Sequence, residues 1–112
     1  LIHKGASLDP TAVPATTALR MATCFGAEAL FLTEIGTLEV GKKADFISIR
    51  TDGPRWQPEH DLVSNLVYSA SSSDIEDVYV NGRALMRHRE CLTVDEERVR
   101  FQVKKVWGQL DI

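Results

Sequence analysis

Three residue types that bind metals lie close together near the end of the sequence. His88, Glu90 and Cys91 form an H-x-E-C pattern, and H-x-E with cysteine ligands activates water on zinc in one class of hydrolytic deaminase. That chemistry also needs a P-C-x-x-C pair, which the sequence does not contain. In an extended strand His88 and Glu90 would share one face. We therefore interpret them as an exposed surface pair.

The other candidate ligands are scattered. His60 and Asp61 are neighbours, but a catalytic metal usually takes three protein ligands, and His3 and His88 show no ligand spacing. The pattern predicts a loop histidine followed by a helix-capping aspartate. Cys24 falls on an apolar helical face, which favours a core position over a nucleophile. The sequence thus predicts no catalytic, cofactor-binding or metal-binding residue in this chain.

A glycine-rich stretch, residues 36–43 (G-T-L-E-V-G-K-K), nearly matches the phosphate-binding loop of nucleotide-binding proteins. Lys43 stands where that loop needs a hydroxyl group to hold magnesium. Phosphate binding also uses the amide dipoles of a helix that follows the loop, whereas alternation over residues 44–50 predicts a strand. We interpret residues 36–43 as a turn that leads into this strand.

Length and composition are typical of one globular domain. The chain has 112 residues, of which 44% are hydrophobic and 26% charged, so disorder and collagen-like repeats are excluded. With 13 Lys and Arg against 16 Asp and Glu, the net charge of −3 argues against a nucleic-acid partner. No apolar run reaches the roughly 18 residues of a membrane span. Two cysteines make no disulfide scaffold, so we expect a cytoplasmic protein.

The first half of the sequence predicts mainly helix. From Ala15 onward, apolar residues recur at steps of three and four, and we expect Gly26 to divide this region into two short helices. Residues 61–70 predict another helix, with Asp61 as its N-cap. Residues 71–74 (S-S-S-D) predict a loop.

The second half predicts strands and a final helix, which makes the fold class α+β. Residues 75–80 and 83–92 flank an Asn-Gly pair, the signature of a β-hairpin with a type I′ turn. Thr93 and Glu96 fit a capping box at the start of an amphipathic helix. This helix carries basic residues, which we interpret as a solvated face, and one apolar stripe: Val99, Val103, Val106, Trp107 and Leu110.

The sequence starts L-I-H-K-G, without an initiator methionine. We interpret it as a piece of a longer protein that begins near the end of a helix. A processed mature N-terminus is the alternative.

Two blocks of sequence resemble the C-terminal signature of the amidohydrolase superfamily. Residues 22–30 follow the pattern A-T-x-x-G-A-x-A-L, and residues 35–45 follow I-G-[ST]-L-E-x-G-K-x-A-D. The opening of the chain, the segments at residues 60–75 and 80–83, and L-T-V-D-E-E at residues 92–97 are similar to the branch that contains methylthioadenosine/S-adenosylhomocysteine deaminases and related chlorohydrolases. The resemblance covers nearly all of the chain. One departure is Phe31, where relatives often have glycine, so a tighter or shifted loop is expected there.

The resemblance implies an enzyme with a metal-bearing (β/α)8 barrel and a β-sandwich assembled from both ends of the chain. Residues 1–31 would be the last barrel helices, residues 32–92 the C-terminal part of the sandwich, and residues 93–112 a helix that packs back on the barrel. In this family a divalent metal, usually zinc, activates water, and its ligands include an H-x-H that is absent here. The implied role of these 112 residues is structural, and we expect the chain alone to bind no metal and to be inactive.

The expected function of the whole protein is hydrolytic deamination of methylthioadenosine, S-adenosylhomocysteine or a related amino-heterocycle. Its expected partners are this small heterocyclic substrate, the remainder of its own chain and possible further copies in a homo-oligomer. Guanine, an imidazolone or a chlorotriazine are alternative substrates within the superfamily. A non-enzymatic oligomerisation or interaction module is the alternative from another class.

Overall fold

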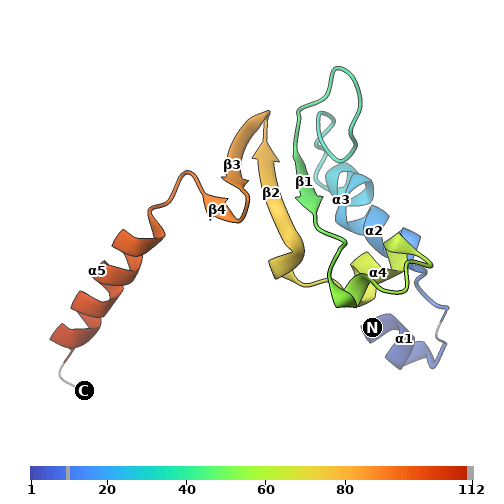
Figure 1. The fold of residues 1–112 in the computed structure, drawn as a ribbon. Helices are drawn as coiled ribbons and strands as arrows, with labels where there is room; N and C mark the ends of the chain where they lie inside the picture. Colours follow the sequence, from blue (N-terminus) through green and yellow to red (C-terminus); the bar gives the residue numbers. More distant parts are fainter. Residues whose placement is uncertain (10, 111–112) are drawn as a thin grey trace.

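The computed structural model describes residues 1–9 and 11–110 and combines short helices with one antiparallel sheet (Figure 1). The helices are α1 (Ile2–Ser7), α2 (Ala15–Ala22), α3 (Cys24–Ala29), α4 (Leu62–Tyr68) and α5 (Glu96–Gln109), with 3₁₀ turns η1 (Pro54–Trp56) and η2 (Ser72–Asp74). The strands are β1 (Phe46–Ile49), β2 (Ile75–Val80), β3 (Arg83–Arg87) and β4 (Glu90–Cys91). The predicted mixture of helices and strands is confirmed.

The four strands follow one another in the order β1-β2-β3-β4. Between β2 and β3, Asn81 and Gly82 have φ values of 51° and 75°, and Val80 pairs with Arg83. Two positive φ angles in a two-residue loop define a type I′ turn. The predicted hairpin is therefore confirmed at its turn.

The second arm of this hairpin is not one continuous strand. A further two-residue turn at His88 and Arg89, with φ values of 49° and 68°, divides it into β3 and β4. Non-glycine residues rarely adopt this left-handed conformation, although histidine does so more often than most, and long-range bonds hold both residues in place. The His88 N–H donates to Asp77 Oδ1 at 3.0 Å, and the Arg89 guanidinium donates to the Ser72 and Ile75 carbonyl oxygens at 2.9 and 2.8 Å.

The break between α2 and α3 lies at Thr23, so the predicted break at Gly26 is wrong. The Thr23 hydroxyl donates to the Leu19 carbonyl at 2.8 Å, and its N–H donates to Arg20 at 3.2 Å. Both bonds join Thr23 to the last turn of α2, and the helix ends there. Gly26 lies within α3, where a Cβ atom would come within 2.9 Å of the Met21 carbonyl oxygen. Glycine thus permits the close approach of the two helices.

Helix α4 begins as predicted. The Asp61 carboxylate accepts from the N–H groups of Val63 and Ser64 at 3.0 and 3.2 Å, which makes Asp61 the N-cap. Residues 71–74 are not a plain loop, because η2 lies there. A capping box between Ser71 and Asp74 stabilises this turn.

Helix α5 begins at Glu96 with Asp95 as its N-cap, so the predicted capping box at Thr93 is wrong. The Asp95 carboxylate accepts from the Arg98 N–H at 3.0 Å. Figure 1 shows α5 as a separate arm that projects away from the sheet. Across the described residues, 1–9 and 11–110, no helix has the length and apolarity needed to cross a bilayer.

Candidate functional site

The glycine-rich loop at residues 36–43 leads into β1 and opens no helix, which confirms its prediction as a turn before a strand. Lys42 Nζ donates to Thr37 Oγ1 at 2.8 Å and lies 3.1 Å from Glu39 Oε2. The Thr37 hydroxyl also donates to Glu39 at 2.7 Å, and these two neighbours lower the pKa of Glu39. The lysine that would hold a phosphate is thus engaged within its own loop.

Gly36 allows this loop to pack closely against the helices. Its φ of 96° lies in the left-handed region, and a Cβ atom would come within 2.7 Å of Ala27 Cβ and 3.1 Å of Cys24 Cα. At the other end of the loop, the Lys43 N–H donates to the Glu34 carbonyl at 2.8 Å, and the two side chains pair at 3.2 Å. The family-like G-T-L-E-V-G-K-K-A-D block is therefore a tethered structural loop.

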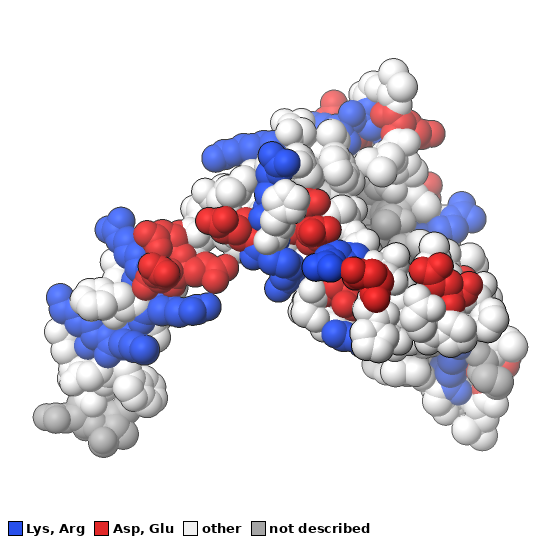
Figure 2. Space-filling model, in the orientation of Figure 1, with Lys and Arg blue, Asp and Glu red and all other residues white. Residues whose placement is uncertain are grey.

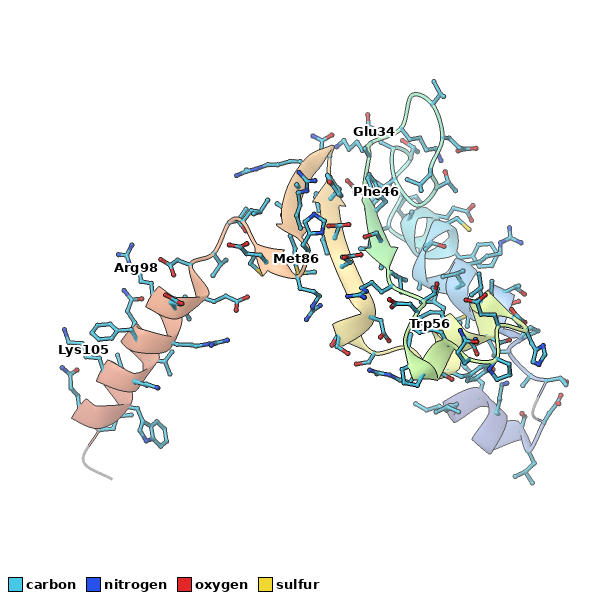
Figure 3. All side chains as sticks on the ribbon, in the orientation of Figure 1. Glu34, Phe46, Trp56, Met86, Arg98 and Lys105 are labelled. Atoms are coloured by element: carbon cyan, nitrogen blue, oxygen red, sulfur yellow. The ribbon has the colours of Figure 1, made fainter. Side chains whose placement is uncertain are left out.

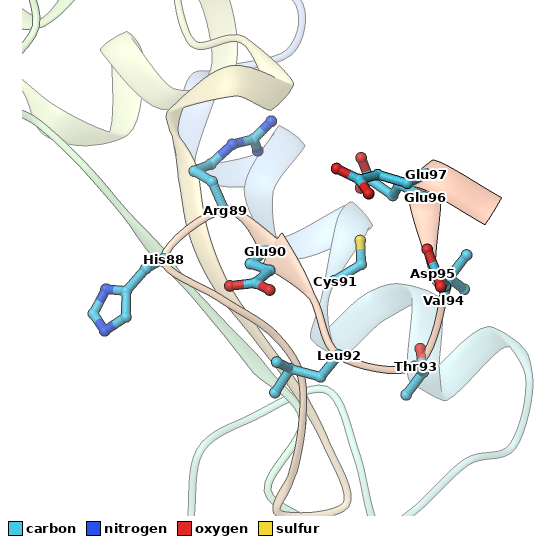
Figure 4. A pocket seen from close by; sticks show the side chains of 10 residues that line it. All are labelled: His88, Arg89, Glu90, Cys91, Leu92, Thr93, Val94, Asp95, Glu96 and Glu97. Atoms are coloured by element: carbon cyan, nitrogen blue, oxygen red, sulfur yellow. The ribbon is translucent and has the colours of Figure 1, made fainter. Parts of the chain in front are cut away.

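The H-x-E-C pattern lies beside a hollow between β4 and α5, lined by residues 88–97 (Figure 4). His88 projects to the side opposite Cys91, and its Nδ1 lies 3.6 Å from Glu76 Oε1. His88 and Glu90 are both exposed, as predicted, but they do not share a strand face, because His88 sits in a turn.

Cys91 faces the first turn of α5 rather than a histidine (Figure 4). The neighbouring Glu96 carboxylate raises the pKa of the Cys91 thiol by accepting a hydrogen bond from the protonated thiol, and desolvation adds to this effect. A nucleophilic or metal-binding cysteine needs a lowered thiol pKa. This environment favours an unreactive thiol.

The remaining candidates lie apart from one another. His3 is exposed on α1, and His60 is exposed in the loop before α4. Cys24, expected in the core, is half-buried at the start of α3, with its thiol 3.8 Å from the Arg20 carbonyl oxygen. Within the part of the chain that the structure describes, no three His, Cys, Asp or Glu residues lie close enough to hold a metal ion. These donors do not fit a catalytic metal.

The surface carries a different kind of site, made of apolar side chains. In residues 1–9 and 11–110, the buried hydrophobic residues are Ala27 and Trp56, whereas many large apolar side chains are exposed. A groove of about 770 Å³ runs between α2, α3 and β1, and its lining includes Leu19, Ala22, Leu30, Ile35 and Phe46. The sequence pattern did not reveal this groove, because its lining comes from three separate segments.

Helix α5 carries a second apolar face. A shallow groove on it is lined by Val103, Val106, Trp107 and Leu110 together with Gln102. Figure 3 shows Arg98 and Lys105 projecting from α5 on the side away from the sheet. The predicted amphipathic character of this helix is confirmed, and its apolar face is available for docking.

Comparison with known proteins gives consistent matches. The sequence model of the amidohydrolase family matches residues 1–85. The chain is 50% identical over 107 residues to a 5-methylthioadenosine/S-adenosylhomocysteine deaminase of Acetivibrio thermocellus, and this match covers 95% of this chain and 25% of the relative. It is 49% identical over 102 residues to the protein of the same name from Halalkalibacterium halodurans, and this match covers 91% of this chain and 23% of the relative. The chain thus spans about a quarter of the length of the curated relatives it matches.

Solved structures show the same similarity. An adenosine deaminase from Xanthomonas campestris with bound zinc matches at a TM-score of 0.86 and 33% identity, over 95% of this chain and 24% of that one. An atrazine chlorohydrolase from Arthrobacter aurescens, complexed with zinc, matches at a TM-score of 0.75 and 32% identity. This match covers 84% of this chain and 21% of that one.

Proposed function

Because the chain belongs to the amidohydrolase family, we propose that it is the C-terminal segment of a metal-dependent hydrolase that deaminates methylthioadenosine, S-adenosylhomocysteine or a related adenosine-like substrate. The observation that carries the proposal is the 44–50% identity to deaminases of this name over more than nine-tenths of the chain. In the proposed reaction, water adds to the ring carbon that bears the amino group, and ammonia leaves.

The proposed role of these residues is structural. Residues 1–31 supply the last helices of a barrel, residues 32–92 the C-terminal part of a sandwich, and residues 93–112 a helix that packs on the barrel. The tethered loop at residues 36–43 and the exposed apolar faces support this role. A divalent metal, when bound, would lower the pKa of water. Since the described residues do not fit a metal, we assign its ligands to the remainder of the protein.

The test is the activity of the whole reading frame. The protein that includes the sequence upstream of Leu1 should release ammonia from methylthioadenosine or S-adenosylhomocysteine, whereas the 112-residue chain alone should release none. Adenosine, guanine and an imidazolone complete the panel. Turnover by the 112 residues alone would overturn the proposed structural role. A reading frame without any upstream domain would favour a free-standing interaction module instead.

A chlorotriazine is the second candidate substrate. It is favoured by the match to triazine hydrolase structures, at 31–32% identity. The chlorotriazine ranks second because the chain is more similar in sequence to the deaminases than to the triazine hydrolases. Release of chloride from atrazine without release of ammonia from the nucleosides would reverse this order.

A further inference from the structure

The charges of α5 are divided along its length. Its acidic residues, Glu96 and Glu97, lie in the first turn, and its basic residues follow them: Arg98, Arg100, Lys104 and Lys105. Figure 2 shows acidic side chains gathered where this arm joins the rest of the molecule and basic side chains spread along the arm. A helix with an acidic start and a basic body is complementary in charge to a second copy of itself that runs in the opposite direction.

One side of α5 combines both charges with an aromatic ring. Glu97, Phe101, Lys104 and Gly108 recur at steps of four, three and four, and at 100° per residue they lie within an arc of about 60°. This outer face points away from the apolar stripe of the same helix. All four residues are exposed, and the Phe101 side chain is 68% exposed. The outer face therefore stays open when the stripe is packed.

The outer face has the features of a contact with another helix. Within residues 1–9 and 11–110, the ion pair of α5 joins Glu96 to Arg100 at 3.6 Å, which leaves the charges of Glu97 and Lys104 free to pair elsewhere. A Cβ atom at Gly108 would meet nothing within 4 Å, so packing inside this chain does not require a glycine there. The missing side chain allows a neighbouring backbone to come close.

Two antiparallel copies of α5 bring complementary side chains together. When Glu97 lies level with Lys104 of the second copy, two-fold symmetry repeats this pair with the roles exchanged. The same register places the two Phe101 rings side by side, one residue step of about 1.5 Å apart in height. Arg100 of each copy also comes close to Arg100 of the other, but its ion pair with Glu96 offsets this repulsion.

We infer that the outer face of α5 is a homodimer contact, in which Phe101 packs on Phe101 of the second copy and Glu97 pairs with Lys104 of that copy. This inference rests on the proposed function, because that function covers the apolar stripe and leaves the outer face free. Helix α5 has 14 residues and is about 21 Å long. A contact of this length is smaller than a standard interface, so the dimer should form reversibly as concentration rises.

The experiment measures the self-association of the protein that includes the sequence upstream of Leu1, by sedimentation velocity at rising concentration. Lys104→Glu should weaken dimerisation at least about tenfold, because symmetry makes each substitution act on two pairs. Lys105→Glu, the same charge change at the next residue but off the outer face, should weaken it by less than about threefold. Glu97→Lys combined with Lys104→Glu exchanges the charges and should restore the dimer. Phe101→Gln should also weaken it, and glutamine favours helix more than phenylalanine does.

A zero-length carbodiimide cross-link tests the register directly. In a mixture of isotope-labelled and unlabelled protein, it should join Glu97 of one copy to Lys104 of the other. Three results would overturn the inference: a protein that stays monomeric at every concentration, equal dimerisation of the Lys104→Glu and Lys105→Glu variants, or no restoration by the charge exchange. A dimer that releases ammonia from no substrate of the panel would count against the proposed function alone. An active monomer would count against this inference alone.

Discussion

Asp45 Oδ1 accepts a hydrogen bond from the backbone N–H of Asn81 at 2.6 Å, across 36 positions of sequence. Beside it, the Gly82 N–H donates to the Ala44 carbonyl at 2.9 Å. Both amides of the type I′ turn are therefore bound by the end of the glycine-rich block. The A-D pair that closes the family-like motif thus joins the loop to the hairpin, and it contacts no candidate ligand site.

Substitutions of Asp45 test this connection between the loop and the hairpin. Asp45→Ala should lower the free energy of unfolding by about 1–2 kcal/mol, because it leaves the Asn81 amide without its acceptor. Asp45→Asn keeps an acceptor oxygen at the same position and should cost less. Urea unfolding of the protein that includes the sequence upstream of Leu1 measures both losses, and equal losses would show that charge, not the hydrogen bond, stabilises the turn.

Two glycines of the same loop form a matched pair. Gly36 and Gly41 both have positive φ angles, 96° and 90°, but a Cβ atom at Gly36 would meet Ala27 at 2.7 Å, whereas at Gly41 it would meet nothing within 4 Å. Gly41→Ala should therefore cost about 1 kcal/mol from backbone conformation alone. Gly36→Ala should cost about 2–4 kcal/mol, because a steric clash adds to the same conformational cost. Thermal unfolding compares them, and equal losses would contradict the close packing at Gly36.

Phe31 ends α3 in a conformation that suits glycine. Its φ is 58°, its N–H donates to Glu28 at 3.0 Å, and the Leu32 N–H donates to Ala27 at 2.9 Å. This is a Schellman motif. Phe31 therefore adopts a backbone turn that favours glycine, and its ring is 90% exposed.

Phe31→Gly should therefore stabilise the protein by about 0.5–1 kcal/mol, since it removes the strain of a left-handed aromatic residue. The rise in melting temperature of the protein that includes the sequence upstream of Leu1 measures this effect. A fall would mean that the exposed ring packs on the remainder of the protein.

Local signals in the sequence predicted the elements whose bonds are also local. The Asn81-Gly82 turn and the Asp61 cap depend on neighbouring residues, and both are present as predicted. The turn at His88 and Arg89 was missed because distant partners stabilise it, including the Ser72 carbonyl. That turn contains no glycine or asparagine, and the moderate preference of histidine for the left-handed region is too weak a signal on its own.

The candidate site could be predicted only in part for the same reason. The stripe on α5 repeats at helical spacing within one segment, so the sequence shows it. The groove beside Phe46 joins residues of α2, α3 and the loop before β1, and only the folded chain brings them together. Donor residues such as His60 and His88 lie too far apart to bind one metal ion together. Their spacing in the sequence already indicated this.

Two adjacent capping patterns compete at the start of α5. Thr93 and Glu96 fit a capping box by sequence, but Asp95 makes the bond to Arg98. Asp95→Ala should destabilise α5 by about 1 kcal/mol, whereas Thr93→Ala should have little effect. Hydrogen exchange of the α5 amides measures both, and faster exchange in the Thr93 variant alone would restore the sequence-based assignment.

The Asp61 cap makes the stability of α4 depend on pH. Hydrogen bonds from the Ser64 hydroxyl, and from the backbone of Ser64 and Val63, lower the pKa of this exposed carboxyl below its ordinary value of 3.8. A carboxyl whose pKa is lower in the folded state stabilises the fold fully above its unfolded pKa, and this contribution is lost as pH falls through the folded pKa.

Asp61→Asn tests this dependence, because asparagine also caps helices but does not titrate. The unfolding free energy of this variant should therefore differ most from that of the parent protein near neutral pH. The difference in unfolding free energy should shrink as pH falls below about 4. Urea unfolding of both proteins between about pH 2.5 and 7 measures it, and a constant difference across this range would contradict the ionised cap.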